Sequence, residues 1–243
     1  MENTPTKKIY LLCLFTVFFQ IYSSPAVAEF HAALAVKTDY IWRGYSKTSE
    51  HFSLQANLDY EHVSGGYFGI TLANVDFDDD EFKDPAKLEI TPYLGWTFKL
   101  SDDWRLDAQW TRYFYDGDIF GHPSDYNEFY LMLHYNDIFS AHVSFSEDYY
   151  NQGHASGNYE LTGRYPITDN FEFSTGIGYS QVTEIFEYDT LNWDAGLTYY
   201  TKFIGFDLRY LDAIETTDAI VTQWPYDPEL IDTTFVFSIF IGF

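Results

Sequence analysis

The feature that most constrains this chain is an alternation of apolar and polar residues, repeated in segments of about ten residues. In residues 51–61, Phe52, Leu54 and Leu58 fall on one face of an extended strand, and Gln55 and Asp59 fall on the other. Because successive side chains of a β-strand point to opposite sides, this pattern predicts strands with one apolar and one polar face. Along the whole chain it predicts twelve strands, at residues 30–42, 51–61, 67–77, 87–98, 104–115, 127–136, 139–148, 157–165, 170–181, 190–200, 204–212 and 232–243.

The links between these predicted strands alternate in length. The short links are 62–66, 99–103, 136–138, 166–169 and 201–203, and the long links are 43–50, 78–86, 116–126, 148–156, 182–189 and 213–231. Bacterial outer-membrane barrels have short periplasmic turns and long extracellular loops. The sequence therefore predicts an all-β fold, a transmembrane antiparallel up-and-down β-barrel of about twelve strands, with both chain ends on the periplasmic side. We expect the longest loop, 213–231, to fold inward and narrow the lumen.

A soluble β-sandwich or barrel is the alternative, because its strands would also alternate around an apolar core. The number of long strands and the rhythm of the links favour the membrane barrel. Aromatic residues also stand near strand ends, where the interfacial girdles of such barrels belong: Tyr40, Trp42, Trp96, Trp104, Phe114 and Tyr179. Pro92 falls within a predicted strand, where it cannot donate a ladder hydrogen bond, and we expect a bulge or a shifted strand boundary there.

The first 28 residues have the order of a secretory signal peptide. Lys7 and Lys8 precede an apolar run, and the small-residue sequence Ala26-Val27-Ala28 predicts cleavage before Glu29. An uncleaved membrane anchor is the alternative, but the apolar run is shorter than the roughly 20 residues that span a bilayer. We therefore expect a removed signal peptide at residues 1–28 and one barrel domain at residues 29–243, in the outer membrane of a Gram-negative bacterium. Cys13, the single cysteine, would leave with the signal.

The charge of the chain is strongly negative, with 37 acidic and 13 basic residues and a net charge of −24. Such a field repels nucleic-acid phosphates, so nucleic acid is excluded as a partner. On the predicted inward faces eleven acids stand against five bases, which indicates a hydrated lumen, since a dry core does not tolerate so many charges. The pore-lining candidates are Lys37, Asp39, Asp59, Glu61, Asp76, Lys87, Glu89, Arg105, Asp107, Glu128, Glu160, Arg164, Glu172, Asp194 and Arg209, with Asp207 as the eleventh acid. We expect a cation preference that fades in concentrated salt.

Arg43 lies at the outer end of the first predicted strand. It is a candidate constriction residue that would act together with loop acids. The alternative role is a salt bridge at the rim that orders the loop.

The other residue patterns predict no catalytic, cofactor or metal site. His142 and Ser144 share an inward face at the spacing used by an outer-membrane phospholipase, but no third group is identifiable to orient the imidazole, so lining of the lumen is favoured. The acids of residues 76–84 would attract divalent cations without the spacing of an EF-hand, and whether residues 78–81 hold a defined ion stays open. The scattered histidines include no helical zinc pair. We expect a protein that is not an enzyme and binds no cofactor.

Two stretches resemble a known family. They are Asp39-Tyr40-Ile41-Trp42-Arg43-Gly44 and residues 64–77, SGGYFGITLANVDF, of which Y-x-W-R-G is the most specific part. They resemble the TorF family of porins, also described as the conserved hypothetical Gcw_chp family, and the resemblance extends over essentially all of residues 29–243. Ala73 and Thr91-Pro92 depart from the family pattern, which puts a shared site near the fourth strand in doubt. The resemblance implies a pore.

These observations favour an outer-membrane channel for passive diffusion of small hydrophilic solutes, with a preference for cations. Two alternatives stay open: a closed structural or adhesive barrel, and a barrel enzyme acting on lipid. The expected partners are outer-membrane lipid and lipopolysaccharide, small solutes or ions, and the barrel assembly machinery, which would recognise the strand ending at Phe243. The sequence leaves open the solute, the oligomeric state, the gating and whether the lumen is plugged.

Overall fold

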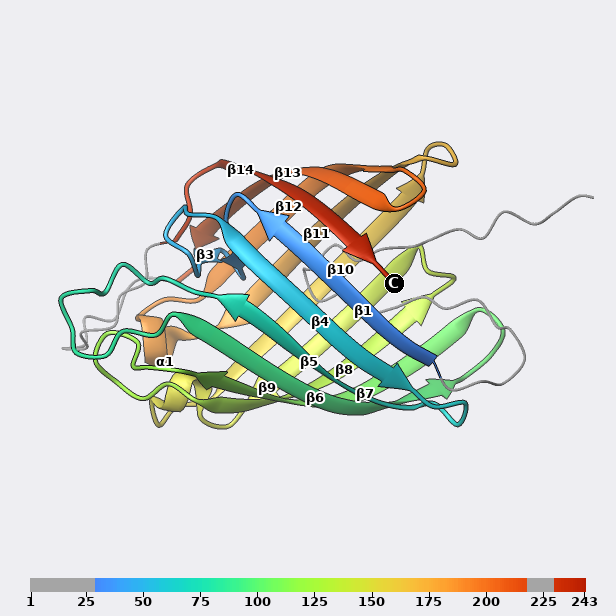
Figure 1. The fold of residues 1–243 in the computed structure, drawn as a ribbon. Helices are drawn as coiled ribbons and strands as arrows, with labels where there is room; N and C mark the ends of the chain where they lie inside the picture. Colours follow the sequence, from blue (N-terminus) through green and yellow to red (C-terminus); the bar gives the residue numbers. More distant parts are fainter. Residues whose placement is uncertain (1–28, 218–229) are drawn as a thin grey trace, which may run out of the picture.

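Twelve antiparallel strands close into one barrel in the computed structural model, which describes residues 29–217 and 230–243 (Figure 1). The barrel strands are β1 (Glu29–Lys37), β4 (Ser53–Glu61), β5 (Gly66–Asn74), β6 (Leu88–Lys99), β7 (Trp104–Tyr115), β8 (Tyr126–Tyr135), β9 (Phe139–Ser146), β10 (Ser156–Pro166), β11 (Phe171–Gln181), β12 (Thr190–Tyr200), β13 (Ile204–Glu215) and β14 (Thr234–Gly242). Each strand pairs with its neighbours in chain order, and β1 closes the ring by pairing with both β4 and β14. The predicted fold class is confirmed.

Short turns and long loops lie at opposite ends of the barrel, as the sequence predicts (Figure 1). We call the end with the long loops the outer end and the end with the short turns the inner end. Two of the long loops carry single helical turns, η1 (Tyr149–Asn151) and α1 (Thr183–Phe186). Across residues 29–217 and 230–243, no helix has the length and apolar character needed to cross a membrane. The predicted signal peptide at residues 1–28 lies outside the described residues.

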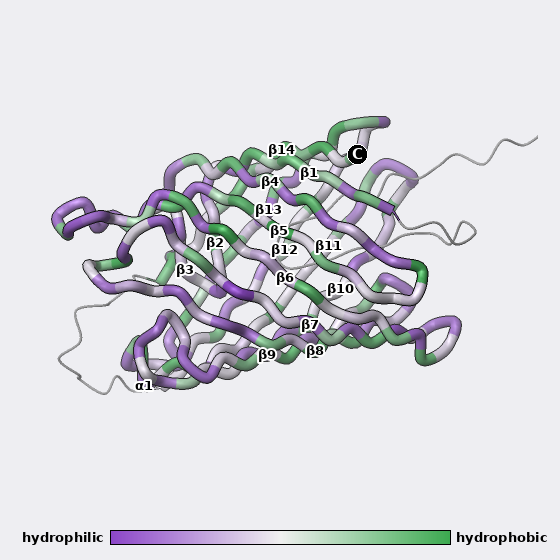
Figure 2. Tube along the Cα trace, turned by 60° about the horizontal axis from the view of Figure 1, so that its bottom comes forward, coloured by the Kyte–Doolittle hydropathy of each residue, from purple (hydrophilic) through white to green (hydrophobic). Residues whose placement is uncertain are grey.

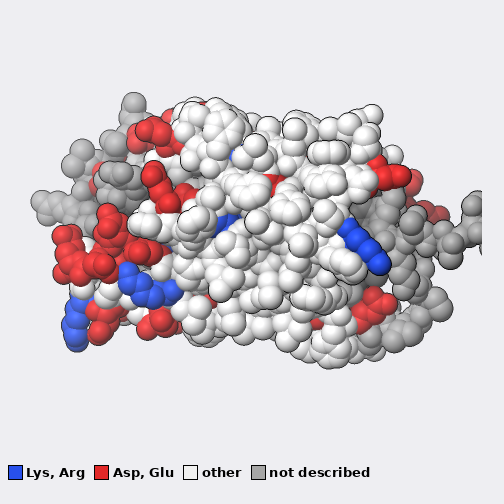
Figure 3. Space-filling view, turned by 45° about the horizontal axis from the view of Figure 1, so that its top comes forward, with Lys and Arg blue, Asp and Glu red and all other residues white. Residues whose placement is uncertain are grey.

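The burial of side chains is the reverse of that in a soluble barrel. Leu58, Phe129 and Leu208 point outward and are about half exposed, whereas Asp59 and Glu128 point inward and are buried. Apolar residues follow the strands in Figure 2, and on the face shown in Figure 3 charged side chains gather at the two ends of the barrel. A continuous apolar exterior of this kind is stable against lipid and not against water. The alternation thus has its physical origin in a lipid-facing exterior and a polar interior.

The first strand is shorter than predicted. β1 ends at Lys37 instead of residue 42, and β2 (Ile41–Trp42) and β3 (Tyr45–Ser46) form a small hairpin apart from the barrel sheet. Arg43 and Gly44, the two residues between β2 and β3, have φ angles of 52° and 88°. Positive φ at both central positions is the geometry of a type I′ turn, whose twist suits a two-residue hairpin. The chain thus leaves the barrel wall after Lys37, and the Arg43-Gly44 turn closes the small hairpin.

Pro92 causes neither a bulge nor a shifted boundary, so that prediction was wrong. Pro92 pairs with Ile70 of β5, and the register between β6 and β7 is the same before and after the proline. The ladder to β7 is interrupted between Ile90 and Tyr93 and then resumes. Loss of one N–H donor thus weakens the pairing locally without requiring an extra residue.

Candidate functional site

Residues 38–52, which carry β2 and β3, fold into the outer end of the lumen, and we call this segment the inward hairpin. Tyr40 and Trp42 are 8% and 6% exposed inside the barrel, so their predicted place in an aromatic girdle was wrong. Trp96 and Trp104 do lie on the exterior. The loop predicted to fold inward, 213–231, falls largely outside the described residues, but the backbone N–H of Ile231 donates to the carbonyl of Gly44 at 2.8 Å.

Asp39, a predicted pore-lining residue, accepts hydrogen bonds from other residues of the inward hairpin. Its Oδ1 accepts hydrogen bonds from Ser46 Oγ at 2.6 Å and from Thr48 Oγ1 at 2.9 Å. The Thr48 hydroxyl also accepts from the N–H of Tyr40 at 2.9 Å. Burial raises the pKa of Asp39 above its ordinary value, and the hydrogen bonds from Ser46 and Thr48 oppose this shift. These hydrogen bonds therefore make the inward hairpin a compact unit.

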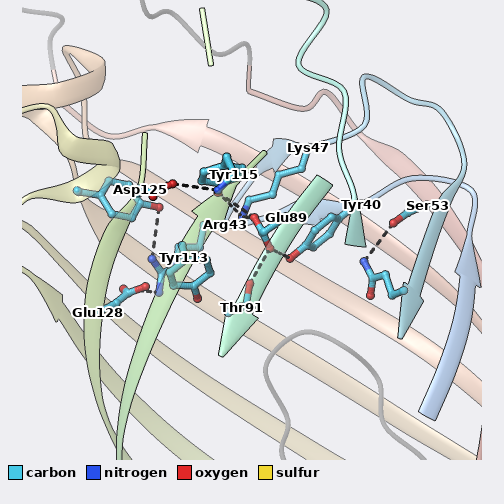
Figure 4. A network of polar contacts seen from close by, with 12 residues as sticks. Tyr40, Arg43, Lys47, Ser53, Glu89, Thr91, Tyr113, Tyr115, Asp125 and Glu128 are labelled. Atoms are coloured by element: carbon cyan, nitrogen blue, oxygen red, sulfur yellow. Dashed lines mark hydrogen bonds and ion pairs between the residues drawn. The ribbon is translucent and has the colours of Figure 1, made fainter. Parts of the chain in front are cut away.

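Arg43 connects the tip of the inward hairpin to the opposite barrel wall. Its Nη2 lies 2.8 Å from Glu128 Oε1 on β8 (Figure 4). The same nitrogen donates to Ser144 Oγ on β9 at 3.0 Å. Its Nη1 donates to Tyr149 Oη at 3.4 Å, and the guanidinium lies over the ring of Trp42. The sequence predicted loop acids as partners, and the structure corrects this, because the partner is an acid of the wall.

Lys47 makes a second connection to the barrel wall, which was not predicted from the sequence. Its Nζ lies 2.6 Å from Glu89 Oε2 on β6, and the two side chains are 1% and 3% exposed (Figure 4). Glu89 also accepts hydrogen bonds from the hydroxyls of Tyr115 at 2.8 Å and Tyr40 at 3.1 Å. Burial lowers the pKa of Lys47 from its ordinary value, and the neighbouring Glu89 opposes this shift. Glu89, which was predicted to line the lumen, is thus the counterion of Lys47 in the inward hairpin.

Aromatic side chains fill the space around these two ion pairs. The inward hairpin, the barrel wall and the outer loops all contribute, and we call the set the outer aromatic cluster: Tyr40, Trp42, Tyr45, Phe77, Tyr113, Tyr115, Tyr126, Tyr149, Tyr150, Phe186 and Tyr188. All of these side chains are at most 9% exposed. Tyr113 stacks on Tyr126 with ring centroids 4.4 Å apart. The outer end of the lumen is therefore packed with side chains.

Most of the predicted pore-lining residues do lie inside the barrel, on the inner face of its wall or, in the case of Asp39, on the inward hairpin. The buried or half-buried ones are Lys37, Asp39, Asp59, Glu61, Glu89, Arg105, Asp107, Glu128, Glu160, Arg164, Glu172, Asp194, Asp207 and Arg209. Asp76 and Lys87 do not, because β5 ends at Asn74 and β6 begins at Leu88. Lys87 Nζ instead pairs with Asp76 Oδ1 at 3.1 Å and Asp80 Oδ1 at 2.8 Å in an exposed loop. With Arg43 and Lys47 added, ten acids of this set face six bases inside the barrel.

The wall of the lumen carries its own ion pairs away from the inward hairpin. Arg209 donates to Asp194, to Ser174 Oγ at 2.6 Å and to Asp207 Oδ2 at 3.3 Å. Toward the inner end, Glu61, Arg105, Arg164 and Glu172 are only half-buried. This region has the polar, partly accessible surface of a hydrated channel.

The pair of His142 and Ser144 faces the lumen. Ser144 Oγ donates to Glu128 Oε1 at 2.6 Å, whereas His142 Nδ1 lies 4.0 Å from Glu160 Oε1. The serine is thus engaged by the Arg43–Glu128 pair inside the barrel. Within the two described ranges, no three His, Cys, Asp or Glu side chains are grouped as metal ligands.

A family model described as "Bacterial protein of unknown function (Gcw_chp)" matches residues 22–243. The chain belongs to the Gcw_chp family. No curated protein matches this Gcw_chp chain in sequence. Among solved structures, it is similar to the KdgM porin, with a TM-score of 0.54 and 8% identity over 89% of this chain and 99% of that one. It is also similar to the NanC porin, with a TM-score of 0.51 and 10% identity over 88% and 99%.

A structure of the KdgM porin in complex with disordered oligogalacturonate is similar as well, with a TM-score of 0.52 and 9% identity over 89% of the Gcw_chp chain and 99% of that chain. At these identities the likeness concerns the fold. This Gcw_chp protein therefore shares its barrel architecture with outer-membrane porins.

Proposed function

We propose that this protein is a TorF-type porin of the outer membrane, a channel for small hydrophilic solutes whose outer end is narrowed by the inward hairpin. The observation that carries the proposal is the charged interior, which extends from Glu61 and Glu172 at the inner end to Glu89 and Glu128 at the outer end. A barrel stabilised by interior packing alone would gain nothing from so many ionisable side chains, because each must be desolvated. Similarity to the KdgM and NanC porins supports the same function.

The interior charge favours cations. Ten acids against six bases leave the lumen net negative, and low-dielectric walls focus such a field along the permeation path. A solved KdgM structure holds oligogalacturonate, which is a polyanion. The negative lumen of this chain supports a different class of solute, neutral or cationic.

A closed barrel is the second candidate, and the outer aromatic cluster favours it. Its side chains are at most 9% exposed, which leaves little room for a hydrated solute at the outer end. Lipid hydrolysis gains no such support, because Ser144 is bonded to Glu128 inside the barrel and away from the lipid.

Planar-bilayer recording separates the two candidates. We expect small cation-selective conductance from the wild-type protein, and conductance about threefold or more larger when a short Gly-Ser link replaces residues 38–52, because the narrowest section limits current. A matched variant lacking residues 80–83 of an exposed loop should conduct like the wild type. Both variants must show heat-modifiable mobility on gels. Absence of current from the folded protein with and without the inward hairpin would establish the closed barrel.

Localisation is tested separately. We expect the protein in the outer-membrane fraction, with Glu29 at its N-terminus after export by the signal peptide. Recovery from the soluble periplasm without detergent would contradict the channel.

A further inference from the structure

The ammonium group of Lys47 lies in a cage of aromatic rings. Its Nζ is 5.0 Å from the ring centroid of Trp42, 5.3 Å from those of Tyr40 and Tyr113, and 6.0 Å from those of Tyr115 and Tyr150. Rings at about 6 Å or less attract a cation through their negative faces, and cages of this kind recognise organic ammonium ligands.

Part of this cage belongs to the barrel wall and to an outer loop, and not to the inward hairpin. Tyr113 and Tyr115 are on β7, Tyr150 is in η1, and the carboxylate that receives the ammonium, Glu89, is on β6. These four residues form what we call the wall half of the cage. We propose that the wall half is a binding site for organic ammonium solutes, and that Lys47 is a tethered occupant that such a solute replaces. The inference rests on the proposed channel function and names its solute class.

The wall half is held in place by contacts within the wall. The Tyr115 hydroxyl donates to Glu89 Oε2 at 2.8 Å. The Tyr113 hydroxyl lies 2.7 Å from that of Tyr130, which in turn donates to Glu128 Oε2 at 2.6 Å. Lys47 Nζ also donates to the Tyr115 hydroxyl at 3.4 Å, but the contacts above do not involve the lysine. Tyr113, Tyr115 and Glu89 therefore stay positioned when it leaves. A preorganised site of this kind avoids part of the ordering cost of binding.

The chemistry of the site selects an organic ammonium over a metal ion. Glu89 is the one carboxylate of the wall half, its Oε2 already accepts a hydrogen bond from the Tyr115 hydroxyl, and the remaining surface is aromatic. Ca²⁺ needs about six to eight oxygen ligands, which this site does not supply. An ammonium group needs one carboxylate and gains from the rings, and Lys47 demonstrates that the site accepts it.

The tether explains why a free solute would bind weakly to the wild-type protein. Lys47 is linked to β1 and β4 by the inward hairpin, so it competes at a high effective concentration, on the order of millimolar or more. A solute that displaces it also removes one of the two ion pairs that hold the inward hairpin. Binding of a cationic solute is thereby coupled to release of the constriction.

The test uses Lys47→Ala and n-propylammonium, which together restore the carbon atoms and the charge of the lysine side chain. In full-length protein in detergent, we expect saturable binding by calorimetry below about 100 mM, a range set by the effective concentration of the tethered lysine. The double variant Lys47→Ala/Glu89→Gln should bind about tenfold or more weakly, because the charged partner is lost. Neither 1-propanol nor NaCl should compete. Equal binding to the two variants, or no binding to the folded single variant, would overturn the proposal and leave Lys47 as a structural anchor.

A measurement on the wild-type protein covers the case in which Lys47→Ala does not fold. We expect n-propylammonium chloride to accelerate amide hydrogen exchange in residues 41–46 relative to NaCl at equal ionic strength. Identical exchange in the two salts would overturn the proposal. A protein that conducts without this response refutes the ammonium site alone, and one that responds without ever conducting refutes the channel alone.

Discussion

The outer and inner ends of the lumen are lined by the same strands with the same alternation, yet they are filled differently. At the outer end, the side chain of Lys47, which pairs with Glu89, is 1% exposed, and the side chain of Glu128, which pairs with Arg43, is 0% exposed. Toward the inner end, the side chain of Arg105 remains 26% exposed although it lies 3.4 Å from Asp107. Alternation therefore decides which side chains point inward, whereas a loop decides whether the space between them is filled.

The largest expected effect comes from Glu128→Gln, which removes the charge opposite Arg43. An uncompensated charge in a buried pair costs about 3–5 kcal/mol, and the inward hairpin can avoid that cost by leaving the lumen. We therefore expect amide exchange in residues 41–46 to accelerate about 100-fold or more, since 1.4 kcal/mol corresponds to roughly tenfold. Hydrogen exchange with mass spectrometry provides the measurement.

Glu172→Gln is the matched control from the inner end. Glu172 is half-buried, and its carboxylate accepts one long hydrogen bond, from Tyr200 at 3.4 Å. We expect no change in the exchange of residues 41–46. If both variants leave the inward hairpin protected, the Arg43–Glu128 pair does not hold it, and the packing of the outer aromatic cluster and the Lys47–Glu89 pair do.

The fold could be predicted from the sequence because the lipid requires an apolar outward face on every strand. The exceptions are residues whose position depends on packing inside the barrel. Tyr40 and Trp42 alternate like residues of a membrane strand, and nothing local distinguishes a ring that faces lipid from one that fills the lumen. The turn signal was Arg43-Gly44, in which arginine stands where Asn or Asp is usual before Gly in a type I′ turn.

The site was less predictable than the fold. Arg43 was singled out, but its partner Glu128 is 85 residues away in the sequence, and the partner of Lys47 is 42 residues away. Periodicity within a strand carries no information about such pairs, since they depend on where a loop turns back. Glu89 and Glu128 were correctly placed inside. Asp76 and Lys87 were misplaced because β5 ends three residues before its predicted end and β6 begins one residue after its predicted start, which leaves both residues in a loop.

A smaller effect is expected from Gly44→Ala, which tests the fit of the hairpin tip against the wall. Gly44 has a φ of 88°, and an added Cβ would lie 2.7 Å from Ala213 Cβ on β13. Overpacking costs about 1–3 kcal/mol, and an alanine at positive φ adds to this. We expect exchange in residues 41–46 to accelerate about tenfold.

Gly153→Ala supplies the control for backbone strain. Gly153 has a φ of 76°, similar to that of Gly44, but it lies in an outer loop where a Cβ added to it would meet nothing within 4 Å. Its substitution adds strain of about 1 kcal/mol without a clash. If Gly153→Ala and Gly44→Ala changed exchange in residues 41–46 equally, contact with β13 would not position the inward hairpin.

The smallest expected effect concerns ion selectivity and involves the inner acids. Glu89 and Glu128 are neutralised by Lys47 and Arg43, so their charges contribute little to the field that a permeating ion meets. Glu61 and Glu172 are half-buried near the inner end, where water reaches them. We expect Glu61→Gln/Glu172→Gln to lower the cation-to-anion permeability ratio by about twofold or less at 0.1 M salt, where the Debye length is about 10 Å. At 1 M that length is about 3 Å, so the difference from wild type should vanish.

Reversal potentials across a salt gradient measure the ratio, and the channel lacking residues 38–52 supplies the larger current for this comparison. A loss of selectivity that persists at 1 M would mean that the two acids bind ions directly, and the inner end would then be a specific site instead of a diffuse negative field.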